Sequence, residues 1–116
     1  MINDPNGRAT SVRSILDGRL VRSGNTILEA SSTVSLVVSA EKRMIVDTGS
    51  PTDLKLLREA LRAASVRPDE VDIVVNTHLH MDHIGGNSLF PNARFYAHRL
   101  ENPSLETIRV SEGFEL

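Results

Sequence analysis

Short runs of strand-forming residues, separated by turn-forming ones, fill the chain between residues 19 and 46. The apolar runs are Leu20-Val21, Thr26-Ile27-Leu28, Thr33 to Val38 and Met44 to Val46. The segments between them are Ser23-Gly24-Asn25, Ser31-Ser32 and Glu41-Lys42-Arg43. β-Branched runs broken by turn residues are typical of strands that follow one another in a sheet. This part of the chain therefore predicts a β-meander.

An amphipathic helix is predicted directly after the last of these runs. Ser50 is the expected N-cap, Pro51 takes the first helical position, and Asp53 follows the cap by three residues. Apolar side chains recur at helical spacing at Leu54, Leu57, Leu61 and Ala64. Charged residues mostly occupy the other faces, so the helix should lie on the sheet. We expect it to end near Ser65, before Pro68.

The run from Val71 to Val75 predicts a buried central strand, because a short apolar run after a helix is typical of a parallel sheet. The polar segment from Asn76 to His83 follows at the carboxyl end of that strand. Ligand sites in α/β sheets gather at such ends. Farther on, Asn87 to Phe90 predicts one helical turn, and Arg94 to Ala97 predicts another strand.

Composition supports a mixed α/β domain. The 116 residues suffice for one domain, and 40% hydrophobic with 24% charged residues excludes a disordered chain. Aromatic residues are only 3%, with no Trp, so the core must consist of Val, Ile, Leu and Ala. The chain has no Cys, which excludes disulfides and thiolate metal ligands.

Charge and hydropathy restrict the partners. The formal net charge is -2, and the 13 basic residues are scattered along the chain. We therefore expect no nucleic-acid partner and no anionic membrane surface. The polar segment from Met1 to Thr10 lacks the apolar stretch of a signal peptide, and no run is long enough to span a bilayer. The expectation is a cytoplasmic protein.

The pattern H-x-H-x-D-H brings together His78, His80, Asp82 and His83, and so three of the four histidines. Neutral imidazole and carboxylate are good ligands for Zn²⁺ and similar ions, and crowding them is favourable when a cation offsets their repulsion. The spacing lets His78 and His80 share one ion while Asp82 and His83 serve a second. His98, which stands alone, is expected to be packed or solvent-facing.

Thr77-His78-Leu79-His80-Met81-Asp82-His83, followed by Gly85-Gly86, resembles the signature of the metallo-β-lactamase superfamily. The resemblance extends back through Val46-Asp47-Thr48-Gly49 and forward through Phe90-Pro91-Asn92-Ala93. Residues from about 19 to 100 are thus similar to the amino-terminal half of the family's αβ/βα sandwich. The expected fold class is α/β, with residues 1–116 as a partial domain and residues 1–18 as a flexible or edge segment.

The resemblance implies a site residue by residue. His78 and His80 would bind a first metal ion and Asp82 and His83 a second, with zinc as the expected metal and other divalent transition metals as alternatives. Asp47 would accept a hydrogen bond that steadies the site. The implied activity is hydrolytic: a metal-bound hydroxide attacks a small-molecule ester, thioester, lactone or phosphodiester, and Asp82 serves catalysis by orienting the hydroxide or carrying its proton.

The family completes its site with downstream ligands that this chain does not match. A catalytic zinc site has three protein ligands and a water, so two ligands per ion are too few. We expect this chain to be an incomplete half that is covered by a complementary carboxyl-terminal half or by a second copy of itself. The alternative is a non-catalytic metal-binding remnant or interaction module; a purely structural zinc protein is less favoured, because no four ligands form a closed cage.

Overall fold

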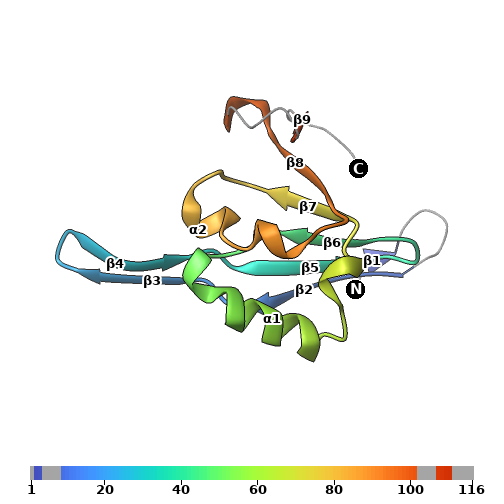
Figure 1. Cartoon of the computed structure of the whole chain (residues 1–116), viewed down its shortest axis with the longest axis horizontal. Coiled ribbons are helices and arrows are strands. Elements are labelled where there is room, and N and C mark those ends of the chain that lie inside the picture. Colours follow the sequence, from blue (N-terminus) through green and yellow to red (C-terminus); the bar gives the residue numbers. More distant parts are fainter. Residues whose placement is uncertain (1, 4–8, 102–106, 111–116) are drawn as a thin grey trace.

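A seven-stranded sheet forms the centre of the computed structural model, which describes residues 2–3, 9–101 and 107–110 (Figure 1). In spatial order its strands are β1 (Ile2–Asn3), β2 (Ala9–Leu16), β5 (Val34–Val38), β6 (Arg43–Val46), β7 (Ile73–Asn76), β8 (Arg94–His98) and β9 (Ile108–Val110). Pairing is antiparallel from β1 to β6 and parallel from β6 to β9. A sheet of mixed antiparallel and parallel strands, accompanied by helices, confirms the predicted α/β class.

The first two strands of the predicted meander form a separate ribbon. β3 (Arg19–Ser23) and β4 (Thr26–Ser31) pair with each other and extend away from the seven-stranded sheet (Figure 1). The expected strands are therefore present, but a single continuous meander is wrong. The ribbon separates because the bend at Ser31 and Ser32 bonds elsewhere: the two hydroxyls accept the N–H groups of Ser50 and Gly49.

β2 is a strand that the hydrophobic pattern did not predict. It pairs with β5, with Val12 opposite Val37 and Arg13 opposite Leu36. Adjacent polar residues (Thr10-Ser11 and Arg13-Ser14) interrupt β2, so it lacks the regular alternation that marks a strand in the sequence. It falls in the segment 1–18 that was expected to be flexible or at an edge; residues 1 and 4–8 of that segment lie outside the described residues.

The predicted amphipathic helix is confirmed. A 3₁₀ turn (Pro51–Asp53) leads into α1 (Leu54–Ala63), and the Ser50 side chain caps the turn by accepting the Thr52 N–H. The helix stops before Ser65, whose φ of 60° lies in the left-handed region that ends helices. Its position follows from Ser50 and Pro51 at one end and from Ser65 at the other.

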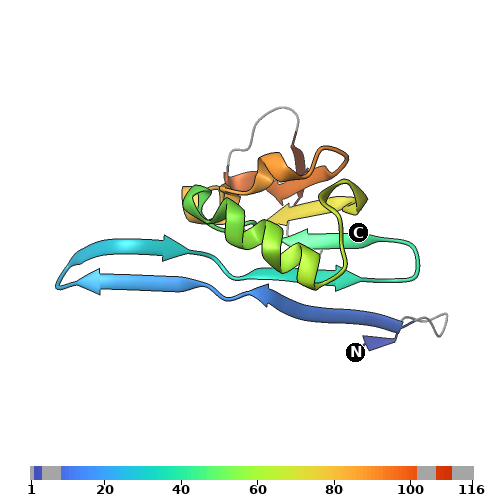
Figure 2. The same ribbon diagram turned by 60° about the horizontal axis from the view of Figure 1, so that its bottom comes forward.

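The core lies between α1 and one face of the sheet. Leu36, Ile45 and Val74 stand side by side on β5, β6 and β7, and they pack with Leu57 and Leu61 of α1. All five are at most 1% exposed. Figure 2 shows α1 lying across this face. Burial of these apolar side chains is the main stabilisation of the fold.

The opposite face of the sheet is also apolar. Strand alternation places Val37, Met44, Val46 and Val75 on it, one residue out of phase with the core positions. These side chains are partly exposed. We call these four residues the outer face.

Short turns complete the chain: the 3₁₀ turns Pro68–Glu70, Asn87–Leu89 and Arg99–Glu101, and the single-turn helix α2 (Met81–Ile84). The turn at Asn87–Leu89 confirms the helical turn that was predicted there. Among the described residues, no helix has the length and apolar content needed to cross a membrane.

Candidate metal centre

The histidine-rich segment leaves the carboxyl end of β7, as predicted. β7 ends at Asn76, and its parallel neighbour β6 ends at Val46. The next residue, Asp47, donates its backbone N–H to the Val75 carbonyl at 2.8 Å. Parallel pairing thus brings the residues after both strands to one edge of the sheet.

Asp47 fixes the orientation of His83. Its Oδ2 lies 3.0 Å from His83 Nδ1, and its Oδ1 accepts the Thr77 N–H at 2.8 Å. The Thr77 hydroxyl also donates to Oδ2. An ionised carboxylate only accepts hydrogen bonds, so Nδ1 of His83 carries the proton and Nε2 is left with its lone pair. The predicted accepting role of Asp47 thus has a geometric basis.

The four predicted ligands lie close together. The rings of His78 and His83 have centroids 4.8 Å apart, and those of His78 and His80 have centroids 6.2 Å apart with planes at 16°. Asp82 Oδ2 lies 3.7 Å from His83 Nε2. In the part of the chain that the structure describes, however, no three such side chains form a group that could hold an ion. The residues are neighbours, but they do not form a complete ligand set.

Three backbone hydrogen bonds hold α2 in place. Ser32 N–H donates to the Asp82 carbonyl at 2.8 Å, and Thr48 N–H donates to the His83 carbonyl at 2.8 Å. Gly85 N–H donates to the Gly49 carbonyl at 2.7 Å. The partner groups of the turn, two N–H donors and the Gly49 carbonyl acceptor, come from the residues after β4 and after β6. The backbone beneath Asp82 and His83 is therefore fixed by segments far away in the sequence.

A buried polar network, which the sequence pattern did not reveal, supports the same turn. The amides of Asn76 and Asn87 form a reciprocal pair at 2.9 and 3.1 Å. The Thr48 hydroxyl donates to Asn87 Oδ1 at 2.8 Å and accepts the Gly86 N–H at 3.0 Å. The one available signal was a polar Asn76 at the end of an otherwise apolar strand.

Gly85 and Gly86 allow close packing of this turn. A Cβ on Gly85 would overlap the backbone of Ser50 and Pro51. A Cβ on Gly86 would lie 2.6 Å from the Thr48 carbonyl oxygen. The turn that carries the histidines is therefore pressed against the start of the helix region.

An ion pair ties the ribbon to this region. Arg19 of β3 lies 2.9 Å from Oδ1 of Asp53, whose side chain is 6% exposed. The hydrogen bond from the Arg19 guanidinium holds the pKa of Asp53 below its usual range, with smaller contributions from the Ser31 hydroxyl and from the charge of Arg19. Burial opposes this shift but is the weaker cause. Asp53 is thus charged at neutral pH and anchors the base of the ribbon.

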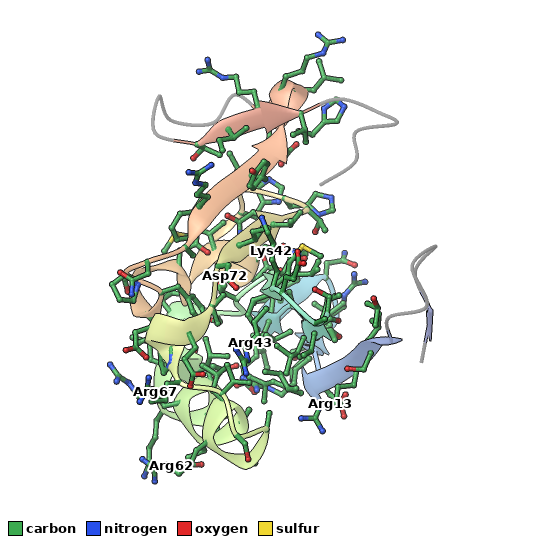
Figure 3. The ribbon with its side chains drawn as sticks, turned by 90° about the vertical axis from the view of Figure 1, so that its right-hand side faces the viewer. Arg13, Lys42, Arg43, Arg62, Arg67 and Asp72 are labelled. Carbon is green, nitrogen blue, oxygen red and sulfur yellow. The ribbon has the colours of Figure 1, made fainter. Side chains whose placement is uncertain are left out.

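The other end of the strands has a different character (Figure 3). Lys42 lies there just before β6, Arg43 at the start of β6 and Asp72 just before β7, and Asp72 Oδ2 accepts the Arg43 N–H at 2.9 Å. A cavity of about 440 Å³ opens beside Arg62 and Arg67, and its described lining contains no imidazole or carboxylate. The groups suited to a transition metal therefore lie at the carboxyl edge.

The donor chemistry at that edge fits a divalent metal. Two donors at 2.0–2.2 Å from a tetrahedral ion are roughly 3.3–3.6 Å apart. The 3.7 Å between Asp82 Oδ2 and His83 Nε2 is close to that separation. His98 is different: its Nδ1 accepts the Leu100 N–H at 3.1 Å. The expectation for His98 was a packed or solvent-facing residue, and its side chain is partly buried.

Comparison with known proteins gives matches to the family that the histidine-rich motif resembles. A model of the metallo-beta-lactamase superfamily matches residues 28–113. The chain is 36% identical over 86 residues to a protein of Methanocaldococcus jannaschii named "Probable metallo-hydrolase MJ0296", covering 74% of this chain and 42% of that protein. It is 44% identical over 59 residues to human metallo-beta-lactamase domain-containing protein 1, covering 51% of this chain and 22% of the human protein.

A solved structure shares the fold. It is a metallo-beta-lactamase-type protein from Thermotoga maritima, with a TM-score of 0.70 and 29% sequence identity, covering 80% of this chain and 45% of that chain. The chain thus spans less than half the length of these relatives. Members of the superfamily are mostly hydrolases and bind divalent metals. Together with the histidine-rich turn after β7, the match over most of the sequence shows that the chain belongs to the metallo-β-lactamase superfamily.

Proposed function

We propose that the chain provides part of a metal-dependent hydrolase site, with His78, His80, Asp82 and His83 as ligands. The observation that carries this proposal is the arrangement of His83. Asp47 accepts from Nδ1 at 3.0 Å, which leaves Nε2 with its lone pair 3.7 Å from Asp82 Oδ2. Metal-binding histidines commonly donate their second N–H to a carboxylate in this way.

The proposed chemistry is hydrolysis of a small-molecule ester, thioester, lactone or phosphodiester. A divalent ion, zinc in the first instance, would lower the pKa of a water molecule to about 7 and polarise the substrate carbonyl or phosphoryl group. Asp82 holds its carboxylate beside His83 on a backbone fixed by Ser32 and Thr48. From there Asp82 orients the attacking water and accepts its proton.

Two ligands per ion leave each ion short of the three that a catalytic zinc site uses. We propose that the remaining ligands come from a complementary carboxyl-terminal half. The size of the matched relatives supports this, because the chain covers 42% of the M. jannaschii protein and 45% of the T. maritima one. Two zinc ions in the completed site follow from the pairing of His78 with His80 and of Asp82 with His83.

The second candidate is a non-catalytic metal-binding or interaction module. It is favoured by one observation: within residues 2–3, 9–101 and 107–110, no three potential ligands form a metal-binding group. Such a module would bind at most one ion through Asp82 and His83 and would not turn over substrate. The two candidates therefore differ in metal stoichiometry and in hydrolysis.

Elemental analysis of the purified, untagged chain tests the proposal. We expect bound zinc in the wild type, at most a small fraction of it in His80→Ala, and full retention in Glu59→Ala, which changes an exposed carboxylate on α1. Equal metal content in wild type and His80→Ala would remove the ligand assignment. Hydrolysis of generic ester, thioester and phosphodiester substrates by the chain assembled with its complementary half then separates the enzyme from the non-catalytic module.

A further inference from the structure

We propose that Glu101 is a positioning residue for the histidine-bearing loop, an inference that rests on the proposed metal site. The Oε1 atom of Glu101 accepts the backbone N–H of Leu79 at 3.0 Å. Leu79 lies between His78 and His80, so this hydrogen bond acts on the peptide that joins two proposed ligands. Glu101 ends the 3₁₀ turn after β8 and is partly buried.

The sheet explains why two residues so distant in sequence meet. β7 and β8 are parallel neighbours, and their last paired residues are Asn76 and Ala97. Leu79 comes three residues after Asn76, and Glu101 comes four residues after Ala97. Parallel strands deliver both segments to the same edge, at similar distances beyond the end of the ladder. The contact is therefore a consequence of strand register.

A carboxylate is suited to this position. A charge-assisted hydrogen bond is shorter and roughly twice as strong as one between neutral groups. The Leu79 N–H donates to the Glu101 carboxylate, 22 residues away. Without the carboxylate, the turn from His78 to His80 would lose this long-range restraint. The backbone would sample more conformations, and more entropy would be lost when the two imidazoles are held on one ion.

The orientation of the histidines agrees with a restrained turn. The His78 and His80 rings lie with planes 16° apart and centroids 6.2 Å apart. Both side chains are exposed, so packing against the core does not hold them. Thr77 Oγ1 lies 3.2 Å from His78 Nδ1. Beyond that contact the backbone sets the directions of the two rings, and the Leu79–Glu101 hydrogen bond restrains the backbone between them. Groups that orient metal ligands commonly contribute ten- to hundredfold to metal affinity.

The test compares wild type with Glu101→Ala and Glu101→Gln, using Glu59→Ala as the matched control on an exposed surface. The first readout is the proton shift and hydrogen exchange of the Leu79 amide in the metal-free chain. The second is the affinity for Co²⁺ and the visible spectrum of the bound ion. We expect Glu101→Ala to lose protection of the Leu79 amide and to bind Co²⁺ roughly ten- to hundredfold more weakly. Glu101→Gln keeps an acceptor oxygen and should rescue most of both effects.

The outcomes separate this inference from the proposed function. If the wild type binds no Co²⁺, the proposed metal site fails, while the Leu79 amide still reports whether Glu101 restrains the loop. If wild type and Glu101→Ala bind Co²⁺ equally, the positioning role is overturned. A Glu101→Gln spectrum that has lost one ligand would make Glu101 a ligand and would also overturn it. Should Glu101→Ala not fold, Glu101→Asp takes its place in both measurements, because a carboxylate one methylene shorter cannot keep the same hydrogen bond to the Leu79 N–H.

Discussion

The carboxylate of Asp47 lies 3.0 Å from Nδ1 of His83 and also accepts the Thr77 N–H. One buried side chain therefore links the end of β6 to both ends of the histidine-rich turn. Asp47 itself has a φ of 59°, in the left-handed region that few non-glycine residues adopt. Such conformations persist where the surroundings impose them, commonly at functional sites. Three donors on one carboxylate supply that constraint here.

Asp47→Asn should weaken metal binding roughly ten- to hundredfold. Asparagine tolerates a positive φ, so the backbone is kept, but one of its two polar groups is a donor. When the amide N–H₂ faces His83, Nδ1 must accept, and Nε2 then carries the proton and cannot bind a metal. Competition titration with a chelator measures the affinity. Unchanged affinity would show that His83 is not oriented through Asp47.

Asp82→Asn should abolish most metal-dependent function while leaving the fold intact. Asp82 lies on a turn whose backbone, not its carboxylate, is bonded to the rest of the protein. We expect its free energy of unfolding to change by about 0.5 kcal/mol or less. Leu57→Ala, in the fully buried core, should cost about 2–5 kcal/mol and keep the bound metal. Denaturant unfolding and metal analysis of both variants test the separation; a loss of stability in Asp82→Asn equal to that of Leu57→Ala would assign Asp82 to structure.

Gly85→Ala should destabilise the protein by about 1–3 kcal/mol, because the new Cβ overlaps the backbone of Ser50 and Pro51. Since Gly85 N–H bonds to the Gly49 carbonyl, the shift should also disturb the turn that carries His83. Ser88→Ala, at an exposed position nearby, is the control. Urea unfolding of the two variants measures the cost. Equal midpoints would show that the turn can move away from Pro51 freely.

The ion pair of Arg19 with Asp53 should make stability depend on pH. The pKa of Asp53 is lowered in the folded state, chiefly by its hydrogen bond with Arg19. Its contribution is therefore complete above the unfolded value of about 3.9 and is lost as the pH falls through the lower folded value. Asp53→Asn should lower the urea midpoint at pH 7, and the difference from wild type should shrink below about pH 4. A difference that stays constant with pH would exclude this ion pair as its source.

Local patterns predicted most of the elements. Ser50 and Pro51 marked the start of the helix region, and the helix lies where the spacing of Leu57 and Leu61 placed it. The continuous meander was wrong, because turn residues at Ser31 and Ser32 do not reveal which segments they will bond to. β2 was missed, because its pairing with β5 is long-range and its adjacent polar residues break the alternation expected of a strand.

The candidate site also contains residues that the sequence predicted and residues that only the fold reveals. His78, His80, Asp82 and His83 stand in one run and were predicted together, and Asp47 followed from the resemblance. Asn87 and Glu101 act through partners 11 and 22 residues away, so only the folded sheet brings them to the site. A short-range motif predicts the side chains that are proposed to bind the metal. The side chains that support their turn are brought to the site by strand register, which the motif does not contain.

The outer face should associate with a partner. Val37, Met44, Val46 and Val75 form a contiguous apolar surface on neighbouring strands, and they are only partly buried. Apolar surface of this kind on a sheet commonly marks an interface. We expect a complementary carboxyl-terminal half to cover it, because the chain covers only 42% of the M. jannaschii protein and 45% of the T. maritima one. A second copy of the chain is the alternative occupant that the measurement must separate.

Val37→Lys should abolish that association. A charged side chain on the outer face would have to be buried without a partner, which is strongly unfavourable. Leu56→Lys is the matched control: it places the same charge at an apolar position that is 43% exposed on α1, away from the outer face. Light scattering and intact mass measurement of the wild type should show a complex whose mass identifies the complementary half. The complex should be lost in Val37→Lys and kept in Leu56→Lys. A mass of two copies would assign the face to self-association, whereas a monodisperse monomer that unfolds cooperatively would show that the face needs no cover.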